Sequence, residues 1–203
     1  MKERGKFIVL YGANNLGKTT QAELLINRLK SYGISSAYLK YPIYDLEPTD
    51  PRLNGILRNH TENISALGLQ KIFAQNRRDY EPTLKDRLNG GEWLISEDYK
   101  GTGIAWGLTY GVGLNTLEEI NKDLFPEDYT FCFHGKRFVS SIEQGHLHEE
   151  GGRWEKSRKI HQTLAKRYGW KIIKSDMNQR TIHKEIWHIL TRQLLMDRIK
   201  QLE

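Results

Sequence analysis

One run of residues has the types and order that bind phosphate groups. It matches the pattern G-x-x-x-x-G-K-[ST], it follows an apolar stretch of strand length, and it reads Gly12-Ala13-Asn14-Asn15-Leu16-Gly17-Lys18-Thr19-Thr20. Backbone N–H groups of such a loop surround phosphate oxygens, and the N-terminus of the next helix adds partial positive charge. Lys18 can bridge the β- and γ-phosphates, and the Thr19 hydroxyl can ligate Mg²⁺. The run predicts a nucleoside triphosphate site; the alternative is a glycine-rich turn with a surface lysine.

A metal beside this loop needs a carboxylate, and two follow another apolar run. Glu97 and Asp98 come directly after Trp93-Leu94-Ile95-Ser96, which suits the end of a buried strand. Adjacent residues on a strand point to opposite faces, so we expect only one of the two to face the phosphates. The alternative is a polar strand end that reaches water.

The elements that position these residues alternate between strand-like and helical patterns, which is typical of βαβ units and a parallel sheet. The predicted strands are 7–11, 37–41, 93–96, 129–133 and 170–173. A helix follows the phosphate-binding loop and stops near Lys30, before Gly33. Further helices are predicted at about 63–88, 103–123, 155–168 and 179–200. We therefore expect an α/β fold in a single domain over residues 1–203.

Two segments do not fit this alternation. Residues 42–61 contain three prolines and are predicted to form an ordered connector, and residues 135–153 are predicted to form a short mobile lid. The lid contains His146 and His148, which could ligate a metal, but a third ligand is not evident. A solvated lid is the preferred interpretation of the two histidines.

The composition limits the class of protein. The formal net charge is +6, so either nucleic acid or small anionic ligands would suit the chain. No apolar stretch is long enough to span a membrane. The start of the chain is charged and lacks the long apolar run of a signal peptide, and the single cysteine, Cys132, lies in an apolar run where we expect a buried thiol. A cytoplasmic protein is predicted.

These residues, together with several others, resemble the thymidylate kinase family of P-loop nucleoside monophosphate kinases. The loop continues into Thr19-Thr20-Gln21, the second strand ends at Tyr41-Pro42, and Ile72-Phe73-Ala74-Gln75-Asn76-Arg77 is similar to the helical motif L-F-A-x-x-R. The resemblance implies that Phe73 stacks on the acceptor base and that Arg77 donates hydrogen bonds to it. It also implies a three-layer P-loop NTPase fold with a five-stranded parallel sheet flanked by helices.

A further motif aligns with the family's S-D-R-Y and the small residues and aromatic that follow it. Here the run is Ser96-Glu97-Asp98-Tyr99-Lys100-Gly101-Thr102-Gly103-Ile104-Ala105-Trp106. In this alignment Glu97 takes the place of the family aspartate at the metal. Trp106 takes the place of the aromatic that excludes a 2′-hydroxyl, which implies a deoxynucleotide acceptor.

Three positions depart from the family pattern around the acceptor. Asn14 stands where the family has an acid near the acceptor sugar, while Asp98 and Tyr44 stand where it has arginines that hold the acceptor phosphate. Each lost charge-assisted contact would cost about 1.5–3 kcal/mol, so either another cation substitutes or the acceptor is not held as it is in the family. Lys100 is the preferred replacement, because it would share a face with Asp98 if the strand continued; the other candidates are Arg58 and Arg78.

The resemblance implies an ATP- and Mg²⁺-dependent homodimer that phosphorylates dTMP to dTDP, with no nucleic acid and no membrane as partner. Lys18 and Glu97 would act at the phosphates, and Arg137 or Arg153, at the two ends of the lid, would close over the transferred group. Two alternatives stay open. The acceptor could be another deoxynucleotide or an unphosphorylated deoxynucleoside, or the chain could be a catalytically silent nucleotide-binding protein.

Overall fold

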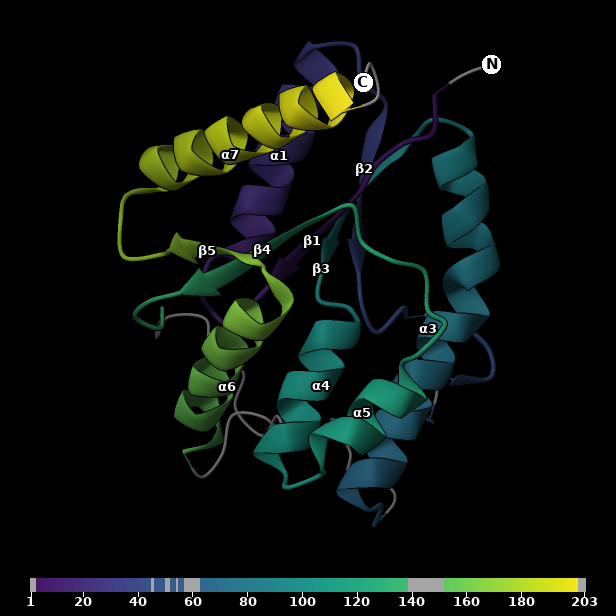
Figure 1. The fold of residues 1–203 in the computed structure, drawn as a ribbon. Helices are drawn as coiled ribbons and strands as arrows, with labels where there is room; N and C mark the ends of the chain where they lie inside the picture. The colour runs from purple at the N-terminus through teal and green to yellow at the C-terminus, as the bar shows by residue number, and fades with distance from the viewer. Residues whose placement is uncertain are drawn as a thin grey trace.

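Five parallel strands form the central sheet (Figure 1), in the order β2-β3-β1-β4-β5. The structure is a computed structural model that describes residues 3–44, 46–49, 52–53, 55–56, 63–138 and 152–200. The strands are β1 (Phe7–Tyr11), β2 (Ser36–Lys40), β3 (Trp93–Glu97), β4 (Tyr129–His134) and β5 (Lys171–Lys174). The predicted sheet is confirmed, with strand ends shifted by about one residue. Because β1 is the central strand, the loop that follows it lies in the middle of the carboxyl edge of the sheet.

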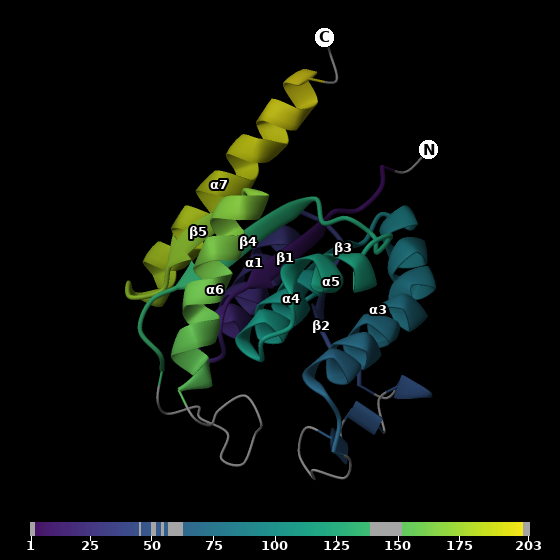
Figure 2. The ribbon, with the colours of Figure 1, turned by 60° about the horizontal axis from the view of Figure 1, so that its bottom comes forward.

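Helices cover both faces of the sheet, which makes three layers (Figures 1 and 2). The helices are α1 (Lys18–Ser31), α3 (Ala66–Asn89), α4 (Lys100–Thr109), α5 (Leu114–Ile120), α6 (Arg153–Tyr168) and α7 (Gln179–Lys200). The end of α7 extends beyond the sheet in Figure 2.

Strand β1 is buried on both faces, and its side chains alternate between two cores. Ile8 and Leu10 pack with residues of α1 and α7. Phe7 and Val9 pack in the other core, with Leu84 of α3 and Ala165 of α6. A continuous apolar run is what a strand covered on both sides requires. This burial holds the phosphate-binding loop at the end of a rigid element.

The predicted helix at 103–123 is wrong in its extent, because the segment forms two helices. Helix α4 starts three residues earlier than predicted and ends at Thr109, and α5 starts at Leu114. Gly111 between them has φ +88°, a left-handed conformation that favours glycine. The backbone N–H of Val112 donates to the Gly107 carbonyl, which closes the turn.

Other predictions have separate outcomes. Cys132 is buried, as expected. Much of the connector at 42–61 and most of the lid at 135–153, including His146 and His148, lie outside the described residues. None of the helices in the described part of the chain is long and apolar enough to cross a membrane.

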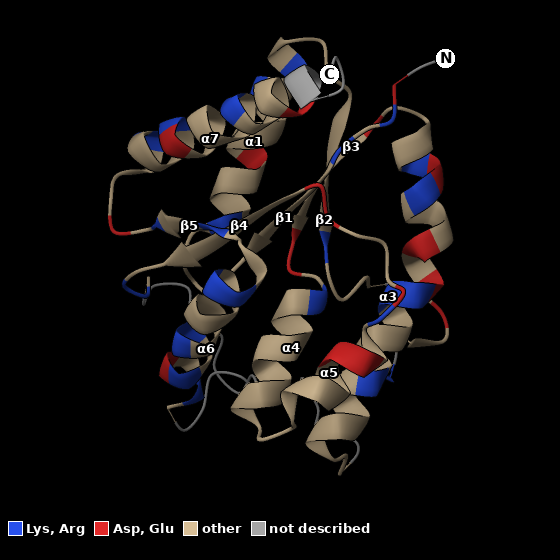
Figure 3. Cartoon of the chain, viewed as in Figure 1, with Lys and Arg blue, Asp and Glu red and all other residues tan. Residues whose placement is uncertain are grey.

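Lysine, arginine and acidic residues are interspersed over the helices on both faces of the sheet in Figure 3.

Candidate active site

A cavity of about 770 Å³ opens at the carboxyl ends of β1, β2 and β3. Its walls come from the loop after β1, the end of β2, one face of α3, the end of β3, the start of α4 and the segment that leads into α7. Ligands of open α/β sheets bind in this position, outside the carboxyl ends of the strands. The cavity is therefore the candidate active site.

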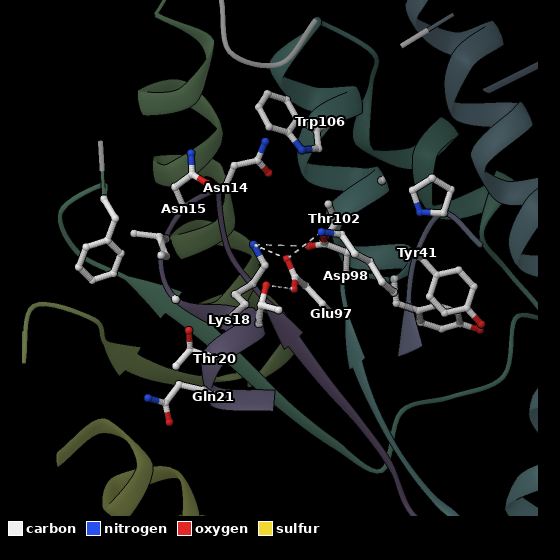
Figure 4. Close-up of a pocket in the computed structure, with 18 of the residues that line it drawn as sticks. Asn14, Asn15, Lys18, Thr20, Gln21, Tyr41, Glu97, Asp98, Thr102 and Trp106 are labelled. Atoms are coloured by element: carbon white, nitrogen blue, oxygen red, sulfur yellow. Dashed lines mark hydrogen bonds and ion pairs between the residues drawn. The ribbon is translucent and has the colours of Figure 1, made fainter. Parts of the chain in front are cut away.

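The phosphate-binding loop forms one wall of the cavity, and two glycines give it its shape. Gly12 and Gly17 have φ +134° and +83°, and a Cβ at Gly12 would come within 2.7 Å of the Phe133 carbonyl oxygen. Lys18 is only 3% exposed, and its Nζ donates to the carbonyls of Gly12 and Ala13 at 3.0 Å each. The lysine is thus fixed beneath the loop, where Figure 4 shows it directed at the carboxylates.

The loop and the end of β3 meet through Thr19 and Glu97. Thr19 Oγ1 donates to Glu97 Oε2 at 2.6 Å, and Tyr38 of β2 donates to the same oxygen at 2.8 Å. The other oxygen, Oε1, lies 3.9 Å from Lys18 Nζ. The hydroxyl and carboxylate oxygens are hard ligands of the kind Mg²⁺ binds beside nucleotide phosphates. In the described part of the chain no cluster of three His, Cys, Asp or Glu residues is available to hold a metal.

The prediction that only one of Glu97 and Asp98 faces the phosphates is wrong. Both side chains line the cavity, and Asp98 Oδ1 lies 3.8 Å from Lys18 Nζ. The alternation rule fails because β3 ends at Glu97 and Asp98 has a left-handed backbone, with φ +65°. Thr102 Oγ1 donates to Asp98 Oδ1 at 2.9 Å and fixes this orientation. Figure 4 shows both carboxylates on the same side as Lys18.

The two carboxyls differ in their electrostatics. Burial alone would raise the pKa of Glu97, but Lys18, Lys40 and the hydrogen bonds from Thr19 and Tyr38 outweigh it and hold the pKa below its ordinary value. Burial raises the pKa of Asp98, and the charge of Glu97 raises it further, while Lys18 opposes both. Glu97 is therefore the more firmly ionised of the pair and the better metal ligand.

Lys40 is a cation of this cavity that sequence reasoning did not identify. It is the last residue of β2, pairs in register with Glu97 of β3, and places Nζ 3.5 Å from Glu97 Oε1. Its side chain is 47% exposed. Burial would lower the pKa of Lys40, but Glu97 and Asp98 raise it above the ordinary value. Its place directly before Tyr41-Pro42 at a strand end was the available signal.

Most of the predicted acceptor residues line the same cavity. They are Asn14, Tyr41, Pro42, Tyr44, Phe73, Arg77 and Trp106. Phe73 also packs against Leu69 of its own helix, so it belongs to a small core as well as to the cavity wall. Arg77 is 3% exposed and donates to Asn121 Oδ1 at 2.8 Å, and burial lowers its pKa to about 10.

The preference for Lys100 as the replacement cation depends on β3 continuing past Asp98, and the strand ends at Glu97 instead. Lys100 begins α4, and its Nζ pairs with Glu127 at 2.9 Å, so it does not line the cavity. Arg78 is directed away as well and donates to the Ile120 carbonyl at 2.6 Å. Arg58 lies outside the described residues. The lysine fails as a replacement cation because the helix starts two residues after Asp98 and turns its side chain away.

The two lid arginines lie against aromatic rings outside this cavity. The Arg137 guanidinium is 5.4 Å from the Trp154 ring centre, and that of Arg153 is 5.2 Å from the Tyr110 ring centre. Arg137 lines a neighbouring cavity of about 370 Å³. Residues 139–151, which make up most of the lid between them, lie outside the described residues. Their predicted part in closing the site stays a prediction.

Known proteins match this chain over nearly its whole length. A family model described as thymidylate kinase matches residues 10–186. A thymidylate kinase of Dictyostelium discoideum is 27% identical over 194 residues, covering 92% of this chain and 85% of its own. A human thymidylate kinase is 24% identical, covering 90% and 88%. The solved structure of thymidylate kinase from Candida albicans superposes with a TM-score of 0.80 at 22% identity, covering 95% and 93%.

Proposed function

Because the chain belongs to the thymidylate kinase family, we propose that it transfers the γ-phosphoryl group of ATP to dTMP and releases dTDP and ADP. One observation carries this proposal. The buried Lys18 and the more exposed Thr19 of a phosphate-binding loop lie next to an ionised glutamate, in a cavity whose other wall presents an aromatic ring and an arginine. Such a site holds two nucleotides with their phosphates facing each other.

On the donor side, Lys18 and the loop N–H groups bind the β- and γ-phosphates of ATP. Thr19 and Glu97 are the residues that would hold Mg²⁺, and this ion, when bound, neutralises phosphate charge. The short distance between their oxygens and the low pKa of Glu97 support this assignment. Catalysis then depends on positioning and charge neutralisation, because phosphoryl transfer needs little covalent help from the protein.

On the acceptor side, Phe73 stacks on the pyrimidine base, Arg77 donates to its edge, and Trp106 occupies the space of a 2′-hydroxyl. All three line the cavity, which supports these roles. Lys40 is the cation we assign to the acceptor phosphate. It is half-exposed at the cavity rim, and its pKa keeps it charged across the physiological range.

Three finer features belong to the same proposal. Arg137 and Arg153 would neutralise charge on the transferred group when the lid closes. The family resemblance supports a homodimer, which sedimentation analysis at several concentrations would test. The single buried thiol of Cys132, whose pKa burial raises to about 12, suits a reducing cytoplasmic compartment.

The test is an assay of ADP release with ATP and, separately, dTMP, dUMP, dCMP, dGMP and thymidine. We expect the highest kcat/KM with dTMP, and no turnover by Lys18→Ala. Turnover confined to dCMP, dGMP or dUMP would identify a different acceptor. ATP binding without turnover of any acceptor would mean that the chain is a catalytically silent nucleotide-binding protein.

One observation favours a second candidate, a kinase for an unphosphorylated deoxynucleoside. Asp98 stands where the family holds the acceptor phosphate with an arginine, and its carboxylate lies 3.8 Å from Lys18 inside the cavity. A carboxylate repels a phosphate but can accept a proton from a 5′-hydroxyl. Turnover of thymidine in place of dTMP in the same assay would establish this alternative.

A further inference from the structure

Gln70 presents a buried side-chain amide to the cavity, and the proposed function assigns no role to this residue. It lies on α3 three residues before Phe73 and seven before Arg77, so the three side chains share one face of the helix. Gln70 is 1% exposed and lines the cavity. Neither its Oε1 nor its Nε2 has a hydrogen-bond partner among the described residues. A buried amide without partners is costly, which indicates a site that is completed by a ligand.

Gly103 of α4 has no side chain, and this leaves space for the ends of the Gln70 and Arg77 side chains. A Cβ added to Gly103 would lie 3.2 Å from Gln70 Oε1 and 3.0 Å from Arg77 Nη2, so both polar groups lie next to Gly103. Arg77 Nε is also without a partner in the described part of the chain. The cavity wall therefore offers an amide acceptor and donor close to guanidinium donors.

This set of groups complements one kind of base edge. Thymine and uracil present an acceptor, a donor and an acceptor in sequence, namely O4, N3–H and O2. An arginine can only donate, whereas an amide can both donate and accept. With Arg77 donating to O4, the amide oxygen of Gln70 is free to accept from N3–H. In cytosine the 4-amino group would face the Arg77 N–H groups, and the N3 lone pair would face the Gln70 oxygen.

We propose that Gln70 is a specificity-determining residue that accepts the N3–H of the acceptor pyrimidine and, together with Arg77, selects thymine and uracil over cytosine. The inference rests on the proposed function, because it assigns one residue of the acceptor site. It gives Gln70 no part in distinguishing dTMP from dUMP, since the 5-methyl group lies on another edge of the base.

The test pairs a change in the protein with a change in the ligand. Binding of dTMP, dUMP, dCMP and N3-methyl-dTMP is measured by titration calorimetry on the unmodified chain, on Gln70→Met and on Gln75→Met. Methionine has nearly the length of glutamine and suits a buried helix position. Gln75 lies on the exposed face of α3, where its Nε2 donates to Asp79, and it is the matched control.

We expect the unmodified chain and Gln75→Met to bind dTMP about tenfold or more tightly than N3-methyl-dTMP, which corresponds to one buried hydrogen bond. In Gln70→Met this ratio should fall to near one, with the affinity for dCMP raised relative to dTMP and the affinity for an ATP analogue unchanged. If the ratio of the affinities for dTMP and N3-methyl-dTMP is unchanged in Gln70→Met, the role of Gln70 is wrong, while the proposed function is unaffected.

The unmodified chain gives a result that does not depend on any variant. If it binds dTMP and N3-methyl-dTMP equally well, the role of Gln70 is wrong although the proposed function stands. If it binds neither dTMP nor dUMP, the proposed acceptor and the role of Gln70 are both wrong. Thermal denaturation of Gln70→Met identifies a purely structural glutamine, which would lower Tm and leave the binding ratio unchanged.

Discussion

Replacing Lys18 with methionine tests the central electrostatic feature of the site. In the folded chain Lys18 Nζ is 3.9 Å from Glu97, 3.8 Å from Asp98 and 3.0 Å from two carbonyl oxygens. Removing one member of such a buried group costs about 3–5 kcal/mol, because the remaining charges lose their compensation. A chain of 203 residues loses roughly 2–4 °C in Tm per kcal/mol, so we expect Tm to fall by about 6–20 °C.

The cost of Lys18→Met should grow with pH. Glu97 has a lowered pKa in the folded chain, so its stabilising contribution is present above its ordinary pKa and is lost as pH falls through the lowered value. Lys18 lowers the pKa of both Glu97 and Asp98, so its removal raises both pKa values in the folded state. Carboxyls with raised pKa values destabilise the folded state as pH rises through those values. The variant is therefore closest to the unmodified chain under acid conditions.

Urea denaturation of the nucleotide-free protein at pH 5 and pH 8 measures this difference. Lys40→Met is the matched control, since Lys40 pairs with the same glutamate but is half-exposed, and it should cost at most about 1 kcal/mol. Adding Asp98→Asn to Lys18→Met should restore part of the stability at pH 8. An equal loss at both pH values, or a loss no larger than that of Lys40→Met, would refute the electrostatic reasoning.

Three kinetic predictions follow from the proposed roles. Glu97→Gln should lower kcat by about 10²–10³ at saturating Mg²⁺, and a rate within threefold of the unmodified chain would contradict its role at the metal. Lys40→Met should raise KM for dTMP about tenfold while KM for ATP stays unchanged; an equal rise in both would contradict contact with the acceptor phosphate. Trp106→Ala should raise kcat/KM for ribothymidine monophosphate relative to dTMP, measured by ADP release, and an unchanged ratio would contradict exclusion of the 2′-hydroxyl.

The fold and the phosphate-binding loop could be predicted because both follow from local rules. Strand-length apolar runs alternate with helical stretches, and the loop residues stand next to one another in the sequence. Phe73 and Arg77 could be expected in the site from the resemblance to the family's L-F-A-x-x-R motif, and their helical spacing places both on one face of α3. Gln70 lies on that same face, but its position near Arg77 in the cavity wall depends on the space left by Gly103 of another helix. Residue spacing within one helix predicts which face a side chain lies on, but it does not predict which residues of other elements that side chain contacts.

The position of Lys40 beside Glu97 could not be predicted from the sequence alone. In the sequence, the first cation after Asp98 is Lys100, which a continued strand would have brought into the site. The strand instead stops at Glu97, Asp98 turns back through a left-handed backbone, and Lys100 joins a helix. A further lysine beside Glu97, Lys40, comes from β2, because Lys40 and Glu97 are partners across two parallel strands more than fifty positions apart. Strand register is a tertiary property, so the charge that meets the carboxylates could be found only once the neighbour of β3 was known.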